Sequence, residues 1–351
     1  MLQTANKNNN PSILLVSVDA LKPEFVFEQE RLGVNLPTIT KYFVENGLTA
    51  PDGMKSVFPT FTYPCHQSMI TGTNPATHKT YNNGIFDPTG EHLGAWHWFV
   101  STEVKTLWEA AKENGYWSAS VAFPTSVGAN GDFIAPEFWW DGSSLDSRFI
   151  DAVAKPQGII LEMEKEIGQY AGGLDLTDAG DAQRGKAALW MLRNKIAPVI
   201  SEKPFFMSAY FASFDESAHV NGVHSKEAAA ALKTVVDQLL SDPQSGIMEV
   251  LTGEEAEKRG GFPEAAYVLV SEKGYELRDD VIGDYCRTTL TQKAQHGYNE
   301  NFPEMRASFM LTGEGIRKGH IDDVRLIDVA PTLAGLMNFI LPDAEGRNLL
   351  K

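Results

Sequence analysis

An acidic residue and a histidine four positions apart, Asp215 and His219, are the first group in the sequence that could hold a metal ion. At this spacing both side chains would lie on the same side of a helical turn. A carboxylate and an imidazole suit zinc, which takes oxygen and nitrogen ligands in tetrahedral sites. Such pairs also occur as helix caps and surface hydrogen bonds, and His296, in a Gln-His-Gly-Tyr loop, is by itself typical of a surface position. Taken singly, these residues leave metal binding and a structural role both open.

A hydroxyl group stands at the centre of the loop Phe58-Pro-Thr-Phe-Thr-Tyr-Pro-Cys-His66, and a helix is predicted to start near His66. The N-terminus of a helix favours an approaching phosphate and a developing alkoxide, so Thr62 is a candidate nucleophile. A threonine at this place is also a good N-terminal cap. Residues 71–78 and 82–88, which follow, indicate turns.

The elements that would position these residues alternate along the chain. Strands are predicted at residues 12–18, 116–123, 205–211, 266–271 and 307–311, and helices at 36–46, 104–114, 150–170, 182–200, 226–240 and 329–339. Strands separated by helices favour an α/β fold with a doubly wound, mostly parallel sheet, which is a three-layer αβα sandwich. Asp19, Asp215 and Ser271-Glu272 each follow a predicted strand, where such sheets carry their active sites.

A single domain over residues 1–351 is expected, because the sequence contains neither an internal repeat nor a low-complexity linker. The first strand, residues 12–18, is a short, mainly apolar run, which is consistent with burial on both of its faces. Residues 124–150 are rich in glycine, proline and aromatic residues. They are expected to form an irregular lid or cap within the domain.

In order along the chain, these segments resemble the type I phosphodiesterase, or nucleotide pyrophosphatase/phosphodiesterase, family of the alkaline phosphatase superfamily. The matching segments are Ile13–Asp19, Phe58–His66, Met69–Pro75 with His78, Asn83–Pro88, Asp215–His219, His296–Tyr298 and Asp328–Leu333 with Gly346-Arg347. They cover nearly the whole chain. The resemblance implies an alkaline phosphatase-like fold and the hydrolysis of a phosphodiester or pyrophosphate-type bond.

The resemblance also implies a role for each matching residue. Thr62 would be the nucleophile, and Asn83 would hold a phosphate oxygen beside the backbone amide of Thr62. A first zinc ion would be bound by Asp215, His219 and His296. Asp19 would bind a second zinc ion together with Thr62 and an Asp-His pair that follows a later strand. One ion would lower the pKa of the nucleophile, and the other would stabilise a phosphate or leaving oxygen.

The sequence departs from the family at the second metal site. Ser271-Glu-Lys-Gly274 stands where the family has Ser-Asp-His-Gly, so Glu272 keeps a carboxylate and Lys273 replaces an imidazole. A protonated lysine has no lone pair for a metal, and two unit charges about 4 Å apart repel by about 4 kcal/mol at an effective dielectric of roughly 20. We therefore expect one zinc ion. Lys273 would either replace the charge of the lost ion near Asp19 and Thr62, or point into solvent while Asp19 and Glu272 hold a weaker metal.

Three hypotheses about function follow. The first is a zinc-dependent hydrolase of a phosphodiester or pyrophosphate-type bond that acts through a covalent Thr62 intermediate. The second is a mono-metal enzyme repurposed for a small non-phosphate organic substrate, with Lys273 as acid, base or anion anchor. The third is an inactive binding homologue, and the retained Thr62 speaks against it.

Bulk charge and composition restrict the partners. A formal charge of −16 disfavours nucleic acid and acidic membrane surfaces, but a small phosphate-bearing substrate stays compatible because a bound metal can reverse the local field. Cys65 and Cys286 cannot form a disulfide framework, which is typical of a reducing compartment. The polar N-terminal segment has no apolar signal region, and no run is long enough to span a bilayer. These features predict a cytoplasmic protein with a small-molecule substrate and leave its oligomeric state open.

Overall fold

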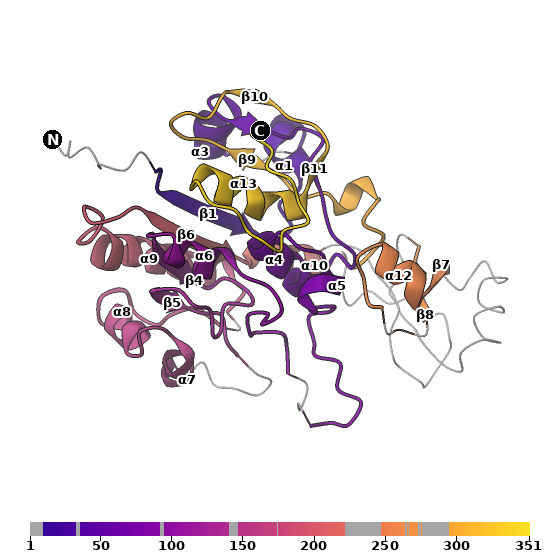
Figure 1. Ribbon diagram of the computed structural model, residues 1–351, viewed down its shortest axis with the longest axis horizontal. Coiled ribbons are helices and arrows are strands. Elements are labelled where there is room, and N and C mark those ends of the chain that lie inside the picture. The colour runs from indigo at the N-terminus through magenta and orange to yellow at the C-terminus, as the bar shows by residue number, and fades with distance from the viewer. Residues whose placement is uncertain are drawn as a thin grey trace.

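The computed structural model describes most of the chain (Figure 1). It covers residues 10–32, 36–91, 95–139, 147–173, 175–221, 247–263, 265, 267–272, 275 and 295–351. The predicted helix at 226–240 lies outside these residues. In the part of the chain that is described, no helix is both long and apolar enough to cross a bilayer.

A parallel sheet of four strands forms the centre of the molecule. Its strands, in spatial order, are β1 (Ile13–Val18), β6 (Phe205–Phe211), β4 (Trp117–Val121) and β5 (Phe133–Ala135). Ile13 pairs with Phe206 and Val18 pairs with Phe211, so β1 and β6 end at the same edge. Residues that follow these two strands are therefore brought together although they are distant in sequence.

Helices cover both faces of this sheet (Figure 1). One face packs against α4 (Thr62–Thr71), α6 (Leu107–Glu113) and α13 (Val329–Leu336), and the other against α8 (Ile159–Ile167) and α9 (Asp178–Met191). Alternation along β6 explains the two cores, because Phe206 belongs to the first and its neighbour Met207 to the second. The predicted three-layer αβα sandwich with a mostly parallel sheet is confirmed.

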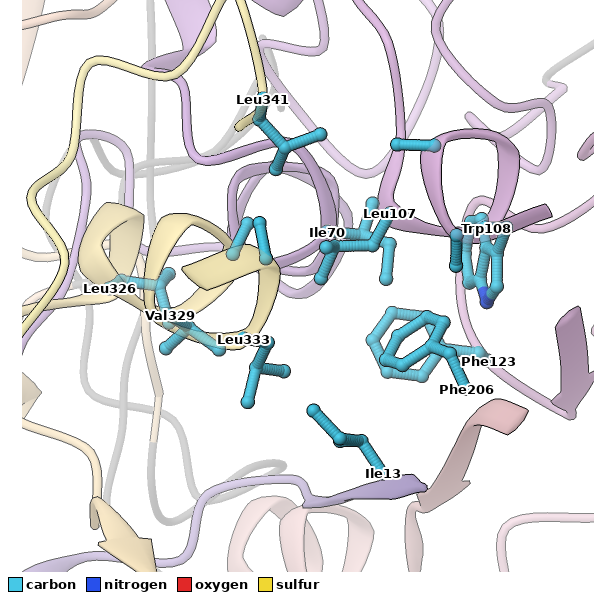
Figure 2. Close-up of a cluster of buried hydrophobic side chains, with 14 of the residues drawn as sticks. Ile13, Ile70, Leu107, Trp108, Phe123, Phe206, Leu326, Val329, Leu333 and Leu341 are labelled. Carbon is cyan, nitrogen blue, oxygen red and sulfur yellow. The ribbon is translucent and has the colours of Figure 1, made fainter. Parts of the chain in front are cut away.

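The first core lies between the sheet and the helices α4, α6 and α13 (Figure 2). Ile13 and Phe206 reach into it from the sheet, and Leu333 reaches into it from α13. The Trp108 ring is fully buried there, and its Nε1 donates a hydrogen bond to Ser208 Oγ at 3.0 Å. This bond satisfies a polar group that burial would otherwise leave unpaired, and it fixes α6 on β6.

Shorter elements surround the sandwich. Three small sheets are formed by β2 (Leu48–Thr49) with β9 (Met310–Leu311) and β10 (Gly319–His320), by β3 (Met54–Lys55) with β11 (Val324–Arg325), and by β7 (Ile247–Thr252) with β8 (Tyr267–Ser271). The remaining helices are α1 (Pro23–Phe27), α2 (Gln29–Leu32), α3 (Pro37–Ile39), α5 (Pro75–His78), α7 (Ser147–Val153), α10 (Ser213–Asn221) and α12 (Gly253–Lys258). Helices α3 and α9 continue as π-helical turns, at Thr40–Val44 and Leu192–Ile196.

Several elements differ from the sequence-based expectation. The helix predicted at 150–170 is two helices, α7 and α8, because Pro156 and the left-handed Gly158 interrupt it. Strand β8 does not join the central sheet but pairs antiparallel with β7. Strand β5 lies inside the segment expected to be an irregular lid. Strand β1 is an edge strand with Leu14 47% exposed, so it is not buried on both faces.

Candidate active site

Asp19 marks the edge of the sheet at which the predicted site residues gather. It follows β1, and its backbone N–H donates to the Phe211 carbonyl at 2.9 Å, continuing the ladder between β1 and β6. Its carboxylate accepts hydrogen bonds from Ala20 N at 3.0 Å and from Tyr210 Oη at 2.8 Å. The side chain is therefore held in the wall of a cavity of about 540 Å³.

Three residues that were predicted to bind zinc converge at the same cavity. Asp215 and His219 lie one turn apart on α10, with Asp215 Oδ2 3.3 Å from His219 Nε2. His296 comes from the loop after residue 294, and its ring centroid is 5.0 Å from that of His219. One potential ligand atom from each residue lies within 4.8 Å of those of the other two. The geometry brings together side chains that are about 80 residues apart in the sequence.

His296 is held by the loop that precedes the predicted nucleophile. The Gly297 N–H donates to Thr60 Oγ1 at 2.9 Å, and Thr60 Oγ1 donates to the Tyr298 carbonyl at 3.2 Å. The Phe61 ring packs edge-on against the His296 ring, with the ring centroids 5.5 Å apart. Gly297 has a φ of +83°, and an added Cβ would lie 2.3 Å from the Phe61 ring, so this close approach requires glycine.

The N-terminus of α10 is held by a carboxylate from α9. Asp181 accepts hydrogen bonds from Ala212 N at 3.0 Å and from Ser213 N at 2.9 Å. The fully buried Arg184 forms an ion pair with Asp181 at 2.9 Å. A negative charge at this position satisfies free N–H groups and complements the helix dipole. Asp181 thereby positions the helix that carries Asp215, and no motif in the sequence pointed to it.

Burial and neighbouring charges shift the pKa values of the ionisable groups at the cavity. Burial raises the pKa of Asp19, and the neighbouring Asp215 carboxylate raises it further. Burial also acts to raise the pKa of Asp215, but the hydrogen bond from His219 and the nearby His296 outweigh it and lower that pKa. Burial lowers the pKa of His296, which favours the neutral ring with a free lone pair.

The donor set fits a zinc ion. One carboxylate and two imidazoles are a common ligand combination for zinc when the metal keeps an open position. The buried His296 Nδ1 has no hydrogen-bond partner among the described residues, which is unusual for a buried polar nitrogen. A bound metal ion would be coordinated by this nitrogen or by the other ring nitrogen, Nε2. Assignment of these three residues as zinc ligands stays a prediction.

Thr62 is the first residue of α4 and lines the same cavity. The helix therefore begins four residues earlier than the sequence suggested, with Phe61 as its N-cap. The side chain of Asn83 approaches the same helix end, where its Oδ1 accepts a hydrogen bond from Tyr63 N at 2.9 Å. This bond leaves the Asn83 amide hydrogens and the Thr62 N–H at the positive end of the helix dipole.

His66 links Thr62 to β1. Its Nδ1 donates to the Thr62 carbonyl at 2.7 Å, because a carbonyl can only accept, and Ser17 Oγ lies 2.9 Å from its Nε2. Burial lowers the pKa of His66, so the ring is neutral and its Nε2 accepts a hydrogen bond from the Ser17 hydroxyl. Sequence analysis gave His66 no role of its own, and in the structure it connects the strand before Asp19 to the first turn of α4, which carries the predicted nucleophile.

The residues predicted for the second metal site are not gathered in the same way. Glu272 follows β8, is exposed, and does not line the cavity that contains Asp19. Lys273 lies outside the described residues. Among the residues that the structure describes, one cluster of three metal-ligating side chains is present, and it does not include Glu272.

Two further side-chain groups lie near Thr62. Trp98 is buried in a cluster with Tyr63, Trp96 and Trp139, and Tyr63 contacts Trp96 edge-on at 5.6 Å. Burial raises the pKa of the Cys65 thiol to about 12, so it is protonated and poorly nucleophilic at neutral pH.

Comparisons with known proteins identify the family and the fold. The model of the family "Type I phosphodiesterase / nucleotide pyrophosphatase" matches residues 13–298. Ectonucleotide pyrophosphatase/phosphodiesterase family member 1 of Mus musculus is 28% identical over 242 residues, which are 69% of this chain and 22% of that protein. Bis(5'-adenosyl)-triphosphatase ENPP4 of Homo sapiens is 22% identical over 66% of this chain and 42% of that protein. The chain thus spans less than half the length of these relatives.

Solved structures show the same fold. Murine ectonucleotide pyrophosphatase/phosphodiesterase 5 superposes with a TM-score of 0.60 over 95% of this chain and 97% of its own, at 16% identity. An inactive variant of that protein in complex with AMP gives a TM-score of 0.56 over 96% of this chain and 97% of its own, at 17% identity. The protein is therefore an α/β sandwich of the alkaline phosphatase-like class. Within this class, the chain belongs to the type I phosphodiesterase/nucleotide pyrophosphatase family.

Proposed function

We propose that the protein is a zinc-dependent hydrolase that cleaves a phosphodiester or pyrophosphate-type bond with Thr62 as the nucleophile. The observation that carries the proposal is that Thr62 and the three predicted zinc ligands line one cavity at the carboxyl edge of the sheet. Membership of the family supports phosphodiesterase chemistry. A solved relative in complex with AMP supports a small phosphate ester as the ligand.

The proposed reaction has two displacements at phosphorus. Thr62 Oγ first bonds to phosphorus while the bond to one ester oxygen breaks, and the released alcohol takes up the threonine proton. Water then bonds to the same phosphorus, the Oγ–P bond breaks, and Thr62 regains a proton as the phosphate monoester leaves. A zinc ion held by Asp215, His219 and His296 would lower the pKa of the Thr62 hydroxyl and offset negative charge on the phosphate.

Donors at the start of α4 would stabilise the phosphate oxygens. The Thr62 N–H lies in the first turn of the helix, and Asn83 is bonded to the next N–H of the same turn. Donors that are fixed before the substrate arrives stabilise developing charge without reorganisation. Asn83 thus fits the role of a phosphate-binding residue, and its bond to Tyr63 N fixes the carbonyl end of its amide.

We further propose that one zinc ion binds per chain. Glu272 is exposed and separate from the Asp215 cluster, so the described residues offer one complete set of three ligands. A second ion would have to rely on Asp19 and Thr62 together with groups outside that set.

Replacement of the nucleophile tests the proposed reaction. Thr62→Ala should lower kcat/KM for a chromogenic phosphodiester at least about 10³-fold, because no other group replaces the nucleophile. Thr62→Ser, which keeps a hydroxyl, should retain far more activity. Zinc content should be unchanged in both variants, which separates loss of chemistry from loss of the site. Full activity in Thr62→Ala would contradict the covalent mechanism, and a zinc-loaded wild type inactive on every phosphate ester would favour a non-phosphate substrate.

A further inference from the structure

The cavity at Thr62 extends well beyond the predicted catalytic residues. Its volume is about 540 Å³, and its remaining walls come from the loop before α1, α1 itself, α4, the start of α10 and residues 302–307. These walls present mainly apolar side chains, namely Leu21, Phe25, Met69, Phe214, Phe302 and Met305. An apolar cavity of this size next to a reactive group is a binding site for part of a small ligand.

Two phenylalanines form an aromatic wall directly beside the predicted metal site. Phe25 from α1 packs edge-on against Phe214 from α10, with ring centroids 4.8 Å apart and planes at 83°. Phe214 immediately precedes Asp215. Both rings are half-buried and line the cavity, so part of their surface is left for a ligand. Aromatic surfaces of this kind bind flat or aliphatic groups by burial of apolar area.

The charges that line the cavity disfavour a polyanionic ligand. Four carboxylates line it, those of Asp19, Glu24, Asp215 and Glu304. Of the cationic side chains that the described residues bring to it, Lys22 pairs with Glu24 at 2.9 Å, and Arg306 donates to the Asp52 carbonyl at 3.0 Å. Because these two cations already have partners, a chain of phosphates would bring several negative charges to a cavity whose described cationic side chains are engaged elsewhere. A diester with one negative charge would meet less repulsion.

We infer that this cavity binds an apolar ester group of a monoanionic phosphodiester, so that the substrate carries an aryl or alkyl group there and not a polyphosphate. The inference rests on the proposed phosphodiesterase function and names its substrate class. The phosphate would lie at Thr62 and the apolar group would contact Phe25 and Phe214. The free energy of burying that group would then contribute to substrate selection.

Phosphonates test this inference without a leaving group. Phenylphosphonate and methylphosphonate carry the same charge and differ in one apolar substituent. As competitive inhibitors of bis(4-nitrophenyl) phosphate hydrolysis by the zinc-loaded protein, phenylphosphonate should have a Ki at least about tenfold lower. Equal Ki values for the two phosphonates would overturn the inference.

A variant assigns the preference to the cavity. Phe25→Ala should bring the two phosphonate Ki values to within about threefold of each other, and Phe86→Ala, a control at a residue that is 76% exposed and away from the cavity, should keep the difference. A preference that survives Phe25→Ala would place the phenyl group elsewhere and overturn the inference. If the wild type hydrolyses no phosphodiester, the proposed function fails. Calorimetric titration of both phosphonates into the zinc-loaded protein then still tests the cavity.

Discussion

Glu137 is a buried acid that is linked to the residue after the predicted nucleophile. Its side chain is 5% exposed, and Tyr63 Oη donates to its Oε2 at 2.6 Å. Burial raises the pKa of Glu137 to about 7, although the Tyr63 hydrogen bond and the nearby Arg184 guanidinium favour the ionised form. The pKa of a glutamate in an unfolded chain is about 4.3. The folded protein therefore binds this proton more tightly than the unfolded chain does.

This difference predicts a pH-dependent stability. The contribution of protonated Glu137 is fully present below the unfolded pKa and is lost as pH rises through about 7. Between pH 5 and pH 8, the free energy of unfolding of the wild type should fall by about 2–3 kcal/mol relative to that of Glu137→Gln. Glutamine can still accept the Tyr63 hydrogen bond but does not titrate. Urea unfolding of both proteins measures the difference, and two parallel pH profiles would contradict it.

At the scale of single residues, sequence reasoning identified side chains with distinctive chemistry but not those that position them. The spacing of Asp215 and His219 and the family motif around Thr62 pointed to residues that the structure gathers in one cavity. Thr60 accepts a hydrogen bond from the backbone of Gly297, which is 237 residues away. Asp181 accepts one from the backbone of Ala212, about 30 residues away. A side chain that bonds to a distant backbone leaves no periodic or spacing pattern in the sequence, so neither role could be predicted.

The helix that carries two of the predicted zinc ligands depends on its capping carboxylate. Asp181→Ala would remove both hydrogen bonds to the start of α10 and leave the buried Arg184 without its ion-pair partner. Loss of a buried ion-pair partner costs about 3–5 kcal/mol, and loss of a residue that orients metal ligands weakens metal binding about 10–100-fold. We expect both effects, measured by urea unfolding and by competition with a zinc-binding dye.

Asp178→Ala is the matched control, because Asp178 is an exposed aspartate in the first turn of the same helix, α9. It should change zinc affinity less than about twofold and stability by less than about 1 kcal/mol, as is usual for exposed surface positions. If both variants behave alike, Asp181 does not position α10. If Asp181→Ala is destabilised but binds zinc normally, its role is confined to folding.

At the scale of elements, apolar periodicity was sufficient for the sandwich but not for its boundaries. Strands β1, β4 and β6 and helices α6 and α13 lie within or overlap their predicted ranges. The segment expected to be one helix, residues 150–170, contains Pro156 and Gly158. The prediction followed the apolar residues on either side of them and gave too little weight to their tendency to interrupt a helix. Strand β8 has the apolar pattern of a central strand, and its pairing with β7 depends on contacts between segments that local pattern does not describe.

At the scale of the whole molecule, the predicted metal site brings together two segments that are distant in the sequence, namely α10 and the loop that carries His296. Asp215 and His219 follow the central sheet, whereas His296 belongs to the loop that packs on Phe61. An ion bound by all three would restrain these segments in the native state alone, since the unfolded chain does not gather its ligands. Metal binding is then coupled to folding, and its free energy adds to the stability of the whole domain.

Removal of zinc should therefore destabilise the protein globally. With zinc at about 1,000 times its Kd the added stability is about 4 kcal/mol, so a chelator should lower the Tm by about 5–10 °C. His296→Ala should show little chelator effect, whereas His320→Ala, at an exposed histidine outside the cavity, should respond as the wild type does. Metal analysis of the wild type should give one zinc per chain, because Glu272 is separate from the Asp215 cluster. Two zinc ions per chain would show that Lys273 does not prevent a second site, and a Tm indifferent to chelation would show that the three side chains hold no structural ion.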